Sequence, residues 1–127
     1  PEIIREGRDV AIIGLGSMVY PAYEAAIELE KRGVSVKVIN ARFAKPINKE
    51  AYIKELKDVK NIFTIEEGVA EGGFGMRLLQ LMDKELRIKM EIIGLPCEFI
   101  THATRRELLQ MYGLDKDGII KRIEKHL

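Results

Sequence analysis

The sequence contains few of the residue types that mark disulfide-bonded or metal-binding proteins. Among 127 residues there are one cysteine, Cys97, two histidines, His102 and His126, and no tryptophan. A single cysteine excludes an internal disulfide and is typical of a reducing compartment, so a cytoplasmic location is expected. Zinc sites use three or four ligands at recognisable spacing, so no metal site is expected. A nucleophile-and-base pair of Cys97 and His102 is disfavoured, because a lone cysteine is usually a small buried hydrophobe.

Long hydrophobic runs are also missing from the chain. The apolar runs, such as VAIIGLG at 10–16, are much shorter than the roughly 20 residues that cross a bilayer. The first residues, PEIIREGRD, are too charged for a signal peptide. These features predict that the protein has no membrane partner.

No charge of one sign dominates the composition. The 21 lysines and arginines nearly balance the 20 acidic residues, so the net charge of +1 predicts no nucleic-acid partner. With 46% hydrophobic and 32% charged residues, the composition is that of a folded globular protein, and residues 1–127 are expected to form one domain. Because the chain begins at Pro1 rather than at methionine, we expect it to be a fragment of a larger multi-domain protein.

Segments typical of strands alternate with segments typical of helices. Runs of apolar or β-branched residues predict strands at 2–6, which would be an extra edge strand, and at 9–15, 34–39, 61–66 and 89–94. Apolar residues at helical spacing predict helices that begin near Ser17, Asn48, Phe74, Thr104 and Asp115. Strand–helix alternation with short connections implies right-handed crossovers and a mainly parallel sheet covered by helices.

Several predicted helix ends carry recognisable capping residues. Ser17, Asn48 and Asp115 are expected to cap the starts of three helices. Thr104 and Glu107 have the spacing of a capping box. The predicted buried stripes consist of Ala22, Ala25, Ala26 and Leu29 in the first helix, Phe74, Leu78, Leu81 and Met82 in the third, and Ile119, Ile120 and Ile123 in the last.

The run GLGSMV at 14–19 is similar to the start of a dinucleotide-binding fingerprint. The third glycine of that fingerprint is replaced by Val19, and the acid that would bind the ribose is replaced by Asn40. Nicotinamide or flavin binding is therefore disfavoured. The glycines are instead expected to let a helix begin close to a strand end, where a helix N-terminus could meet an anion.

The stretch TIEEGVAEGGFGM at 64–76 combines two adjacent carboxylates with a glycine-rich turn. Glu66 and Glu67 would point to opposite faces of a strand, so a catalytic pair that shares one proton is disfavoured. One is expected to accept backbone N–H groups of the turn, and the other to face solvent or a partner. The glycines that permit close backbone approach here are Gly72, Gly73 and Gly75. The stretch lacks the Lys-Ser/Thr pair of a nucleotide-binding P-loop.

The segment INARFAKPI at 39–47 brings two cations to the end of a predicted parallel strand, where α/β sheets bind ligands. Arg42 offers a planar fork that binds phosphate through two hydrogen bonds, and Lys45 adds a second positive charge. The alternative is that Arg42 pairs with a local carboxylate, and composition alone favours this alternative.

Five blocks of sequence, taken in order, cover nearly the whole chain: GRDVAIIGLGSMVYPAYEAA, VINARFAKPIN, TIEEGVAEGGFG, IIGLPCEFITHAT and LLQMYGLDKDGI. Together they resemble the C-terminal domain of the 1-deoxy-D-xylulose-5-phosphate synthase family. The first three are shared more loosely across the transketolase superfamily, whereas the RF-x-KP block and the last two blocks point to the synthases. The chain departs from that family at Cys97, where Asp is usual, and at Ala103, where Gly is frequent.

The resemblance implies a three-layer α/β/α fold with a mixed five-stranded sheet, mostly parallel, whose short N-terminal strand is antiparallel. It implies a transferase that condenses pyruvate with D-glyceraldehyde 3-phosphate and releases CO₂, for isoprenoid, thiamine and pyridoxal biosynthesis. Thiamine diphosphate and Mg²⁺ would be bound by upstream domains, so the isolated domain would be inactive. The implied partners are these upstream domains, a second copy in a homodimer, and the phosphorylated aldehyde.

The resemblance also implies roles for particular residues. Arg42 would bind the phosphate of the acceptor, with Lys45 beside it, and no catalytic, cofactor-binding or metal-binding residue is expected in this chain. The structural turn at a domain or subunit interface would consist of Glu66, Gly72, Gly73, Phe74 and Gly75. Two alternatives stay open. One is the C-terminal domain of a 2-oxo acid dehydrogenase β subunit or a transketolase, and the other is a non-catalytic α/β module that binds a partner.

Overall fold

The computed structural model describes residues 1–42, 46–69, 73–95, 105–111 and 113–127. The strands are β1 (Glu2–Arg5), β2 (Val10–Gly14), β3 (Val36–Asn40), β4 (Asn61–Val69) and β5 (Met90–Leu95). The helices are the 3₁₀ turn η1 (Gly16–Met18) and the α-helices α1 (Val19–Lys31), α2 (Lys49–Leu56), α3 (Phe74–Leu81), α4 (Lys84–Arg87), α5 (Arg105–Met111) and α6 (Lys116–Glu124). No helix in these ranges combines the length and the apolar character that crossing a membrane requires.

The strands form one five-stranded sheet in the order β1-β3-β2-β4-β5. Strand β1 is antiparallel to β3, and the other neighbouring pairs are parallel. Gly14, at the end of β2, is in register with Asn40 of β3 on one side and with Ile65 of β4 on the other. The ends of β2 and β3 therefore lie side by side, next to Ile65 of β4, which continues to Val69. We call this side of the sheet the carboxyl edge. The mixed five-stranded sheet with an antiparallel first strand confirms the expected fold.

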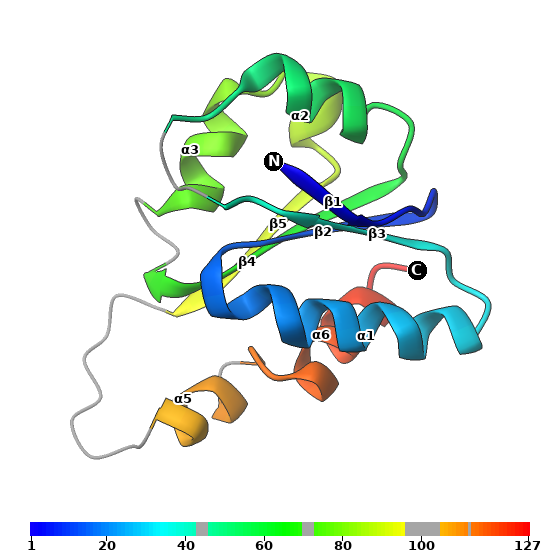
Figure 1. Cartoon of the computed structure of the whole chain (residues 1–127), viewed down its shortest axis with the longest axis vertical. Helices are drawn as coiled ribbons and strands as arrows, with labels where there is room; N and C mark the ends of the chain where they lie inside the picture. Colours follow the sequence, from blue (N-terminus) through cyan, green and yellow to red (C-terminus); the bar gives the residue numbers. More distant parts are fainter. Residues whose placement is uncertain (43–45, 70–72, 96–104, 112) are drawn as a thin grey trace.

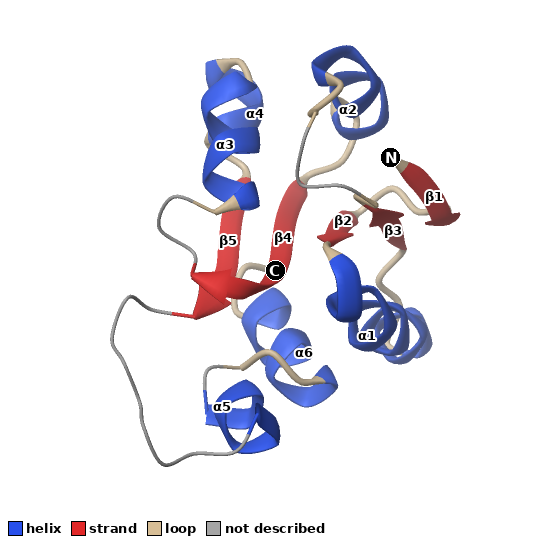
Figure 2. Cartoon of the chain, turned by 60° about the vertical axis from the view of Figure 1, so that its left-hand side comes forward, coloured by secondary structure: helices blue, strands red, loops and turns tan. Residues whose placement is uncertain are grey.

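Helices cover both faces of the sheet, which makes three layers (Figures 1 and 2). Helices α1, α5 and α6 lie on one side, and α2, α3 and α4 lie on the other. Each side has its own core cluster. The central strand β2 is buried along its whole length and supplies both clusters, because Val10 and Ile12 face one side while Ala11 and Ile13 face the other. This double burial explains why the strand reads as a continuous apolar run.

Two of the three expected helix caps are present. The side chain of Asn48 accepts a hydrogen bond from the backbone N–H of Ala51 at 3.1 Å at the start of α2. Asp115 accepts from the backbone N–H of Gly118 at 2.9 Å at the start of α6. Each bond satisfies a donor that the first turn of a helix would otherwise leave unpaired.

The cap expected at Ser17 is wrong. Ser17 lies inside η1, and α1 follows with Met18 as its N-cap and no side-chain hydrogen bond. The Ser17 hydroxyl donates instead to Oε1 of Glu67 at 2.6 Å. The Ser17 hydroxyl, which the local pattern predicted to cap the helix, is therefore bound by a carboxylate 50 residues away in the sequence.

The buried stripes are confirmed in α1 and α6 and corrected in α3. Phe74, Leu78 and Met82 are buried as expected, but Leu81 is 39% exposed. Leu81 is the last residue of α3, and it lines a surface pocket with Ile47 instead of packing into the core. The four-residue helix α4 was not predicted, because one turn carries too little periodicity to be recognised. Strand β4 also continues beyond the predicted 61–66 to Val69. Thr104 lies outside the described residues, so the capping box stays a prediction.

Candidate functional site

The residues singled out from the sequence gather at the carboxyl edge of the sheet. In Figure 1 this edge is on the left, where β4 ends and where the chain turns from β2 into α1. Three features follow the strand ends there: Arg42 after β3, Ser17 after β2, and the Glu66–Glu67 pair in the last part of β4. Open α/β sheets bind ligands at this position, so the edge is the candidate site.

Arg42 has an unusual backbone conformation. Its φ angle is +64°, and every other described residue with positive φ is a glycine. Its backbone N–H donates to the side-chain Oδ1 of Asn40 at 2.9 Å. The preceding residue, Ala41, is held by a hydrogen bond from its N–H to the backbone oxygen of Gly14 at 2.9 Å. Arg42 is exposed at the end of this hydrogen-bonded segment, which follows β3.

Asn40 is a residue whose role the motif comparison missed. In the dinucleotide fingerprint Asn40 is only the replacement of an acid, whereas in the structure its side chain accepts a hydrogen bond from the backbone of Arg42. The signal was available in the sequence, because an asparagine two residues before a loop position is typical of a side-chain-stabilised turn. Lys45, the second expected cation, lies outside the described residues.

Glu66 holds the start of α3 in place. It is buried, with 3% of its surface exposed. Its Oε2 accepts from the backbone N–H of Phe74 at 2.9 Å, and its Oε1 accepts from that of Gly75 at 3.2 Å. Both donors belong to the first turn of the helix, where N–H groups lack helical partners and a negative charge is favoured. This is the contact that was expected of one of the two glutamates.

The glycine at position 75 is required by a close approach of α3 to the sheet. A Cβ atom there would lie 2.4 Å from Oγ1 of Thr64 and 3.0 Å from a methyl group of Ile92. Gly73 precedes the helix as its N-cap with an extended backbone, and Gly72 lies outside the described residues. The contact surface between α3 and the sheet therefore depends on the absence of a side chain at Gly75.

Glu67 has a different partner from Glu66. It accepts the hydroxyl of Ser17, which ties the β2–α1 connection to β4 across the carboxyl edge. The two adjacent carboxylates thus engage separate groups, as the alternation of side chains along a strand predicts. Such an arrangement supports a structural role for both rather than a shared-proton acid pair.

The glycines of GLGSMV also have packing roles. A Cβ atom at Gly14 would lie 2.9 Å from the Cα atom of Val19, so glycine lets the helix begin directly against the strand. Gly16 has a φ of +62°, which a side chain would disfavour. The amide of Asn40, at the ribose-acid position, contacts Arg42 and Glu2. These contacts fit the structural interpretation of the run.

The donor set at the edge does not fit thiamine diphosphate with its metal. Within the described ranges, no group of three or more His, Cys, Asp or Glu side chains could hold a metal ion. The two carboxylates of the carboxyl edge already accept hydrogen bonds from Ser17, Phe74 and Gly75. Cys97 and His102 lie outside the described residues. No step of a reaction is therefore assigned to a cofactor held by these residues.

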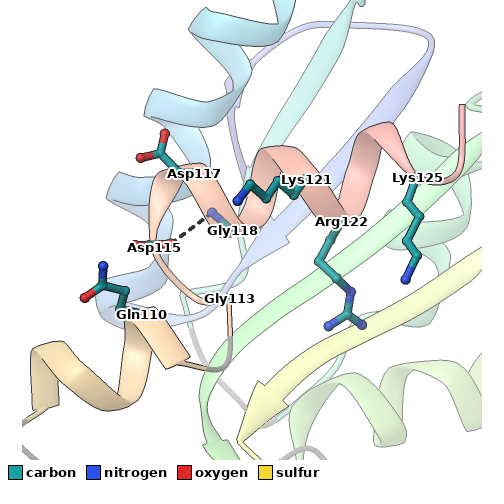
Figure 3. Close-up of a pocket in the computed structure, with 8 residues that line it drawn as sticks. All are labelled: Gln110, Gly113, Asp115, Asp117, Gly118, Lys121, Arg122 and Lys125. Atoms are coloured by element: carbon teal, nitrogen blue, oxygen red, sulfur yellow. Dashed lines mark hydrogen bonds between the residues drawn. The ribbon is translucent and has the colours of Figure 1, made fainter.

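A separate cavity of about 640 Å³ lies between the end of α5 and the exposed side of α6 (Figure 3). It is lined by Gln110, Gly113, Asp115, Asp117, Gly118, Lys121, Arg122 and Lys125. Asp115 is engaged as the cap of α6, and Arg122 donates to Glu91 of β5 at 2.5 Å. Charges of both signs and an engaged arginine give this cavity no chemical preference for one ligand class, and none of the residues predicted from the sequence as site residues lines it.

Comparison with known proteins agrees with the fold. The family described as "Transketolase, C-terminal domain" matches residues 1–119. The 1-deoxy-D-xylulose-5-phosphate synthase of Halothermothrix orenii is 41% identical over 122 residues, which is 94% of this chain and 19% of that protein. The synthase of Gloeobacter violaceus is 39% identical over 127 residues, 99% of this chain and 20% of that protein. The chain thus spans about a fifth of the length of these curated relatives.

Solved structures give the same picture. A split-gene transketolase, described as an inactive beta4 tetramer, superimposes with a TM-score of 0.87 and 29% identity over 97% of this chain and 40% of that one. A transketolase variant from Pichia stipitis has a TM-score of 0.71 at 19% identity, over 97% of this chain and 17% of that one, which supports the fold alone. Sheet order, helix placement and these matches agree, and the chain belongs to the transketolase C-terminal domain family.

Proposed function

We propose that this chain is the C-terminal domain of a 1-deoxy-D-xylulose-5-phosphate synthase. The observation that carries the proposal is the identity of about 40% with synthases over nearly the whole chain, against 29% and 19% with transketolases of known structure. The whole enzyme would condense pyruvate with D-glyceraldehyde 3-phosphate and release CO₂. Its product would supply isoprenoid, thiamine and pyridoxal biosynthesis in the cytoplasm.

The cofactor belongs, in this proposal, to other domains of the enzyme. Thiamine diphosphate and Mg²⁺ would supply the decarboxylating chemistry when bound by the domains that precede this one. The isolated domain is accordingly expected to be inactive.

Within the enzyme, we assign Arg42 to the phosphate of the acceptor aldehyde. Its exposed position at the carboxyl edge and its positive φ support this role, because backbone strain is concentrated at functional positions. A charge-assisted hydrogen bond from an arginine to phosphate is worth about 1.5–3 kcal/mol, or roughly ten- to a hundredfold in acceptor use. Lys45 would add a second cation to the same loop.

The turn from β4 into α3 is proposed to lie at a domain or subunit interface of a homodimer. Glu66 would fix the geometry of this turn, and α3 would present its outer surface to the partner. A second exposed apolar surface lies on the other face of the sheet, at the start of α1: Tyr20 is 70% exposed and, with Ile4 of β1, lines a mainly apolar pocket of about 500 Å³.

The test of the phosphate role is Arg42→Ala in the full-length enzyme, with steady-state kinetics measured separately for pyruvate and for glyceraldehyde 3-phosphate. We expect the KM for the phosphorylated acceptor to rise roughly ten- to a hundredfold while the KM for pyruvate stays unchanged. Arg87→Ala is the matched control, since Arg87 is an exposed arginine on α4. Equal kinetics for both variants would mean that Arg42 is a structural ion-pair residue and that the domain is mainly a scaffold.

The alternative functions predict different substrates and sizes. A dehydrogenase β subunit would act with a lipoyl acceptor, and a transketolase would act on sugar phosphates, so activity with either in place of pyruvate condensation would overturn the synthase proposal. A stand-alone binding module would occur in cells as a chain of this size. An immunoblot that detects only a chain about five times longer, as the relatives' lengths imply, would exclude that module.

A further inference from the structure

The backbone of Arg42 must be held by its surroundings. A side chain in the left-handed region brings its Cβ close to the following carbonyl group, which disfavours the conformation for every residue except glycine. Arg42 nevertheless has a φ of +64°. Conformations of this kind persist where neighbouring groups fix them, and they set the direction in which the side chain leaves the backbone.

Asn40 supplies the fixing contact. Its Oδ1 accepts the N–H of Arg42 at 2.9 Å, closing a turn in which the side chain substitutes for a backbone carbonyl. Its Nδ2 donates to Oε1 of Glu2 at 3.4 Å, which assigns the oxygen to the Arg42 side of the amide. The longer contact adds little energy, but it orients the amide.

The backbone of Asn40 is itself fixed on both sides. It is the last residue of β3, in register with Gly14 of β2 and with Glu2 of the antiparallel strand β1. The N–H of Ala41 then donates to the oxygen of Gly14. The sheet therefore holds Asn40, and Asn40 holds the backbone of Arg42, so the position of the guanidinium group is linked to the rigid centre of the fold.

We infer that Asn40 is a positioning residue for Arg42, which sets the approach of the guanidinium to the acceptor phosphate. The inference rests on the proposed role of Arg42. Without the Asn40 oxygen, the backbone of Arg42 relaxes toward negative φ, the Cα–Cβ bond swings to a new direction, and the arginine reaches the phosphate in a smaller fraction of molecules.

The first test is Asn40→Ala in the full-length enzyme. The loss of one backbone-orienting hydrogen bond is expected to raise the KM for glyceraldehyde 3-phosphate roughly 3- to 10-fold, with the KM for pyruvate unchanged and kcat within about twofold. Asn40→Ser keeps a neutral acceptor that can close the same turn, although more weakly. Its KM for glyceraldehyde 3-phosphate should therefore lie between those of wild type and Asn40→Ala. Asn48→Ala is the matched control, because it removes another asparagine–backbone hydrogen bond, at the start of α2.

A double-mutant cycle separates the inference from the function on which it rests. Asn40→Ala should have no further effect on the acceptor KM in an Arg42→Ala background, because both changes act through one guanidinium. If Arg42→Ala raises the acceptor KM and Asn40→Ala behaves like Asn48→Ala, the inference is wrong and the proposed function stands.

Amide hydrogen exchange tests the contact between Asn40 and Arg42 without relying on activity. Amide hydrogen exchange in the full-length enzyme should be faster at the N–H of Arg42 in Asn40→Ala than in wild type, and slower again in Asn40→Ser. If Arg42→Ala leaves the acceptor KM unchanged, the phosphate role is wrong, and the exchange rate alone then decides the positioning. Unchanged exchange at Arg42 in Asn40→Ala would overturn the inference whatever the kinetics.

Discussion

At the scale of single residues, the hydroxyl of Thr64 is a polar group buried without a described partner. Thr64 is fully buried in β4, and its Oγ1 atom has no hydrogen bond to any residue that the structure describes. The close approach of Gly75 places the first turn of α3 directly against this hydroxyl. A buried hydroxyl without a partner costs free energy of folding. The contact between α3 and β4 at Thr64 is therefore stabilised by close packing rather than by a hydrogen bond.

Replacing the hydroxyl should therefore stabilise the chain. Thr64→Val keeps the branched shape and removes the unpaired group, so we expect the free energy of unfolding in urea to rise by about 0.5–1.5 kcal/mol. Thr64→Ser is the control, since it keeps the hydroxyl and loses a buried methyl group, and it should destabilise by about 1 kcal/mol. A Thr64→Val variant less stable than wild type would show that the hydroxyl makes a favourable contact.

At the scale of secondary-structure elements, the position of α3 depends on one carboxylate. Glu66 accepts hydrogen bonds from the backbone N–H groups of Phe74 and Gly75 at the start of α3. The helix has only eight residues, and its N-cap residue makes no side-chain hydrogen bond. Short helices are marginal alone, so this anchor and the buried stripe of Phe74 and Leu78 hold the element against the sheet.

Glu66→Gln is expected to loosen α3. The amide keeps one acceptor oxygen and turns an NH₂ group toward the second backbone N–H, so one charge-assisted bond is replaced by two facing donors. We expect a loss of about 2 kcal/mol in the free energy of unfolding and weaker association of the proposed full-length homodimer, measured by urea unfolding and by sedimentation. Glu67→Gln is the paired control, because one oxygen still accepts the Ser17 hydroxyl, and its effect should be smaller. Dimer stability that is unchanged in Glu66→Gln would contradict the interface role.

Most elements could be predicted from the sequence because their signals are local. The apolar run of β2 and the caps at Asn48 and Asp115 depend on residues within a few positions of each other. The helix cap predicted at Ser17 was wrong because the partner of its hydroxyl, Glu67, is 50 residues away in the sequence. The burial predicted for Leu81 was wrong because periodicity gives the face of a helix but does not show that its last residue lines a surface pocket.

The candidate site was predictable only in part, for the same reason. The cationic loop after β3 and the two glutamates of β4 could be located, because strand ends in parallel sheets are where ligands bind. The turn at Asn40 has a local signal, but the left-handed backbone of Arg42 was not predicted, since it also depends on the orientation of the Asn40 amide, which contacts Glu2 on another strand.

At the scale of the whole molecule, stability should decline in alkaline solution through Tyr52. Burial raises the pKa of the Tyr52 phenol from 10.0 to about 12. Its ring packs against Phe74 at a centroid distance of 6.2 Å, in the core between α2 and α3. Below pH 10 the phenol is neutral in both states, whereas between pH 10 and 12 the unfolded chain releases a proton that the folded chain retains. The free energy of unfolding therefore falls as pH rises through this window.

The contribution of Tyr52 is measured by comparing wild type with Tyr52→Phe from pH 9 to pH 12. We expect the stability difference between the two to change by about 1–2 kcal/mol across the window, in favour of the variant at high pH, since one pKa unit corresponds to about 1.4 kcal/mol. Tyr20→Phe is the control, because that ring is largely exposed. Parallel pH profiles for wild type and Tyr52→Phe would mean that the phenol ionises equally in both states.

The division of the core by β2 has an evolutionary consequence. Ile12 and Ile13 are adjacent in the chain, yet they belong to separate clusters on opposite faces of the sheet. Substitutions more than roughly 7–10 Å apart that share no contacts usually have additive effects on stability, so changes at such positions in the two clusters should be tolerated independently. Homologues can therefore accumulate repacking mutations one layer at a time while the strand register, and with it the carboxyl edge, is retained.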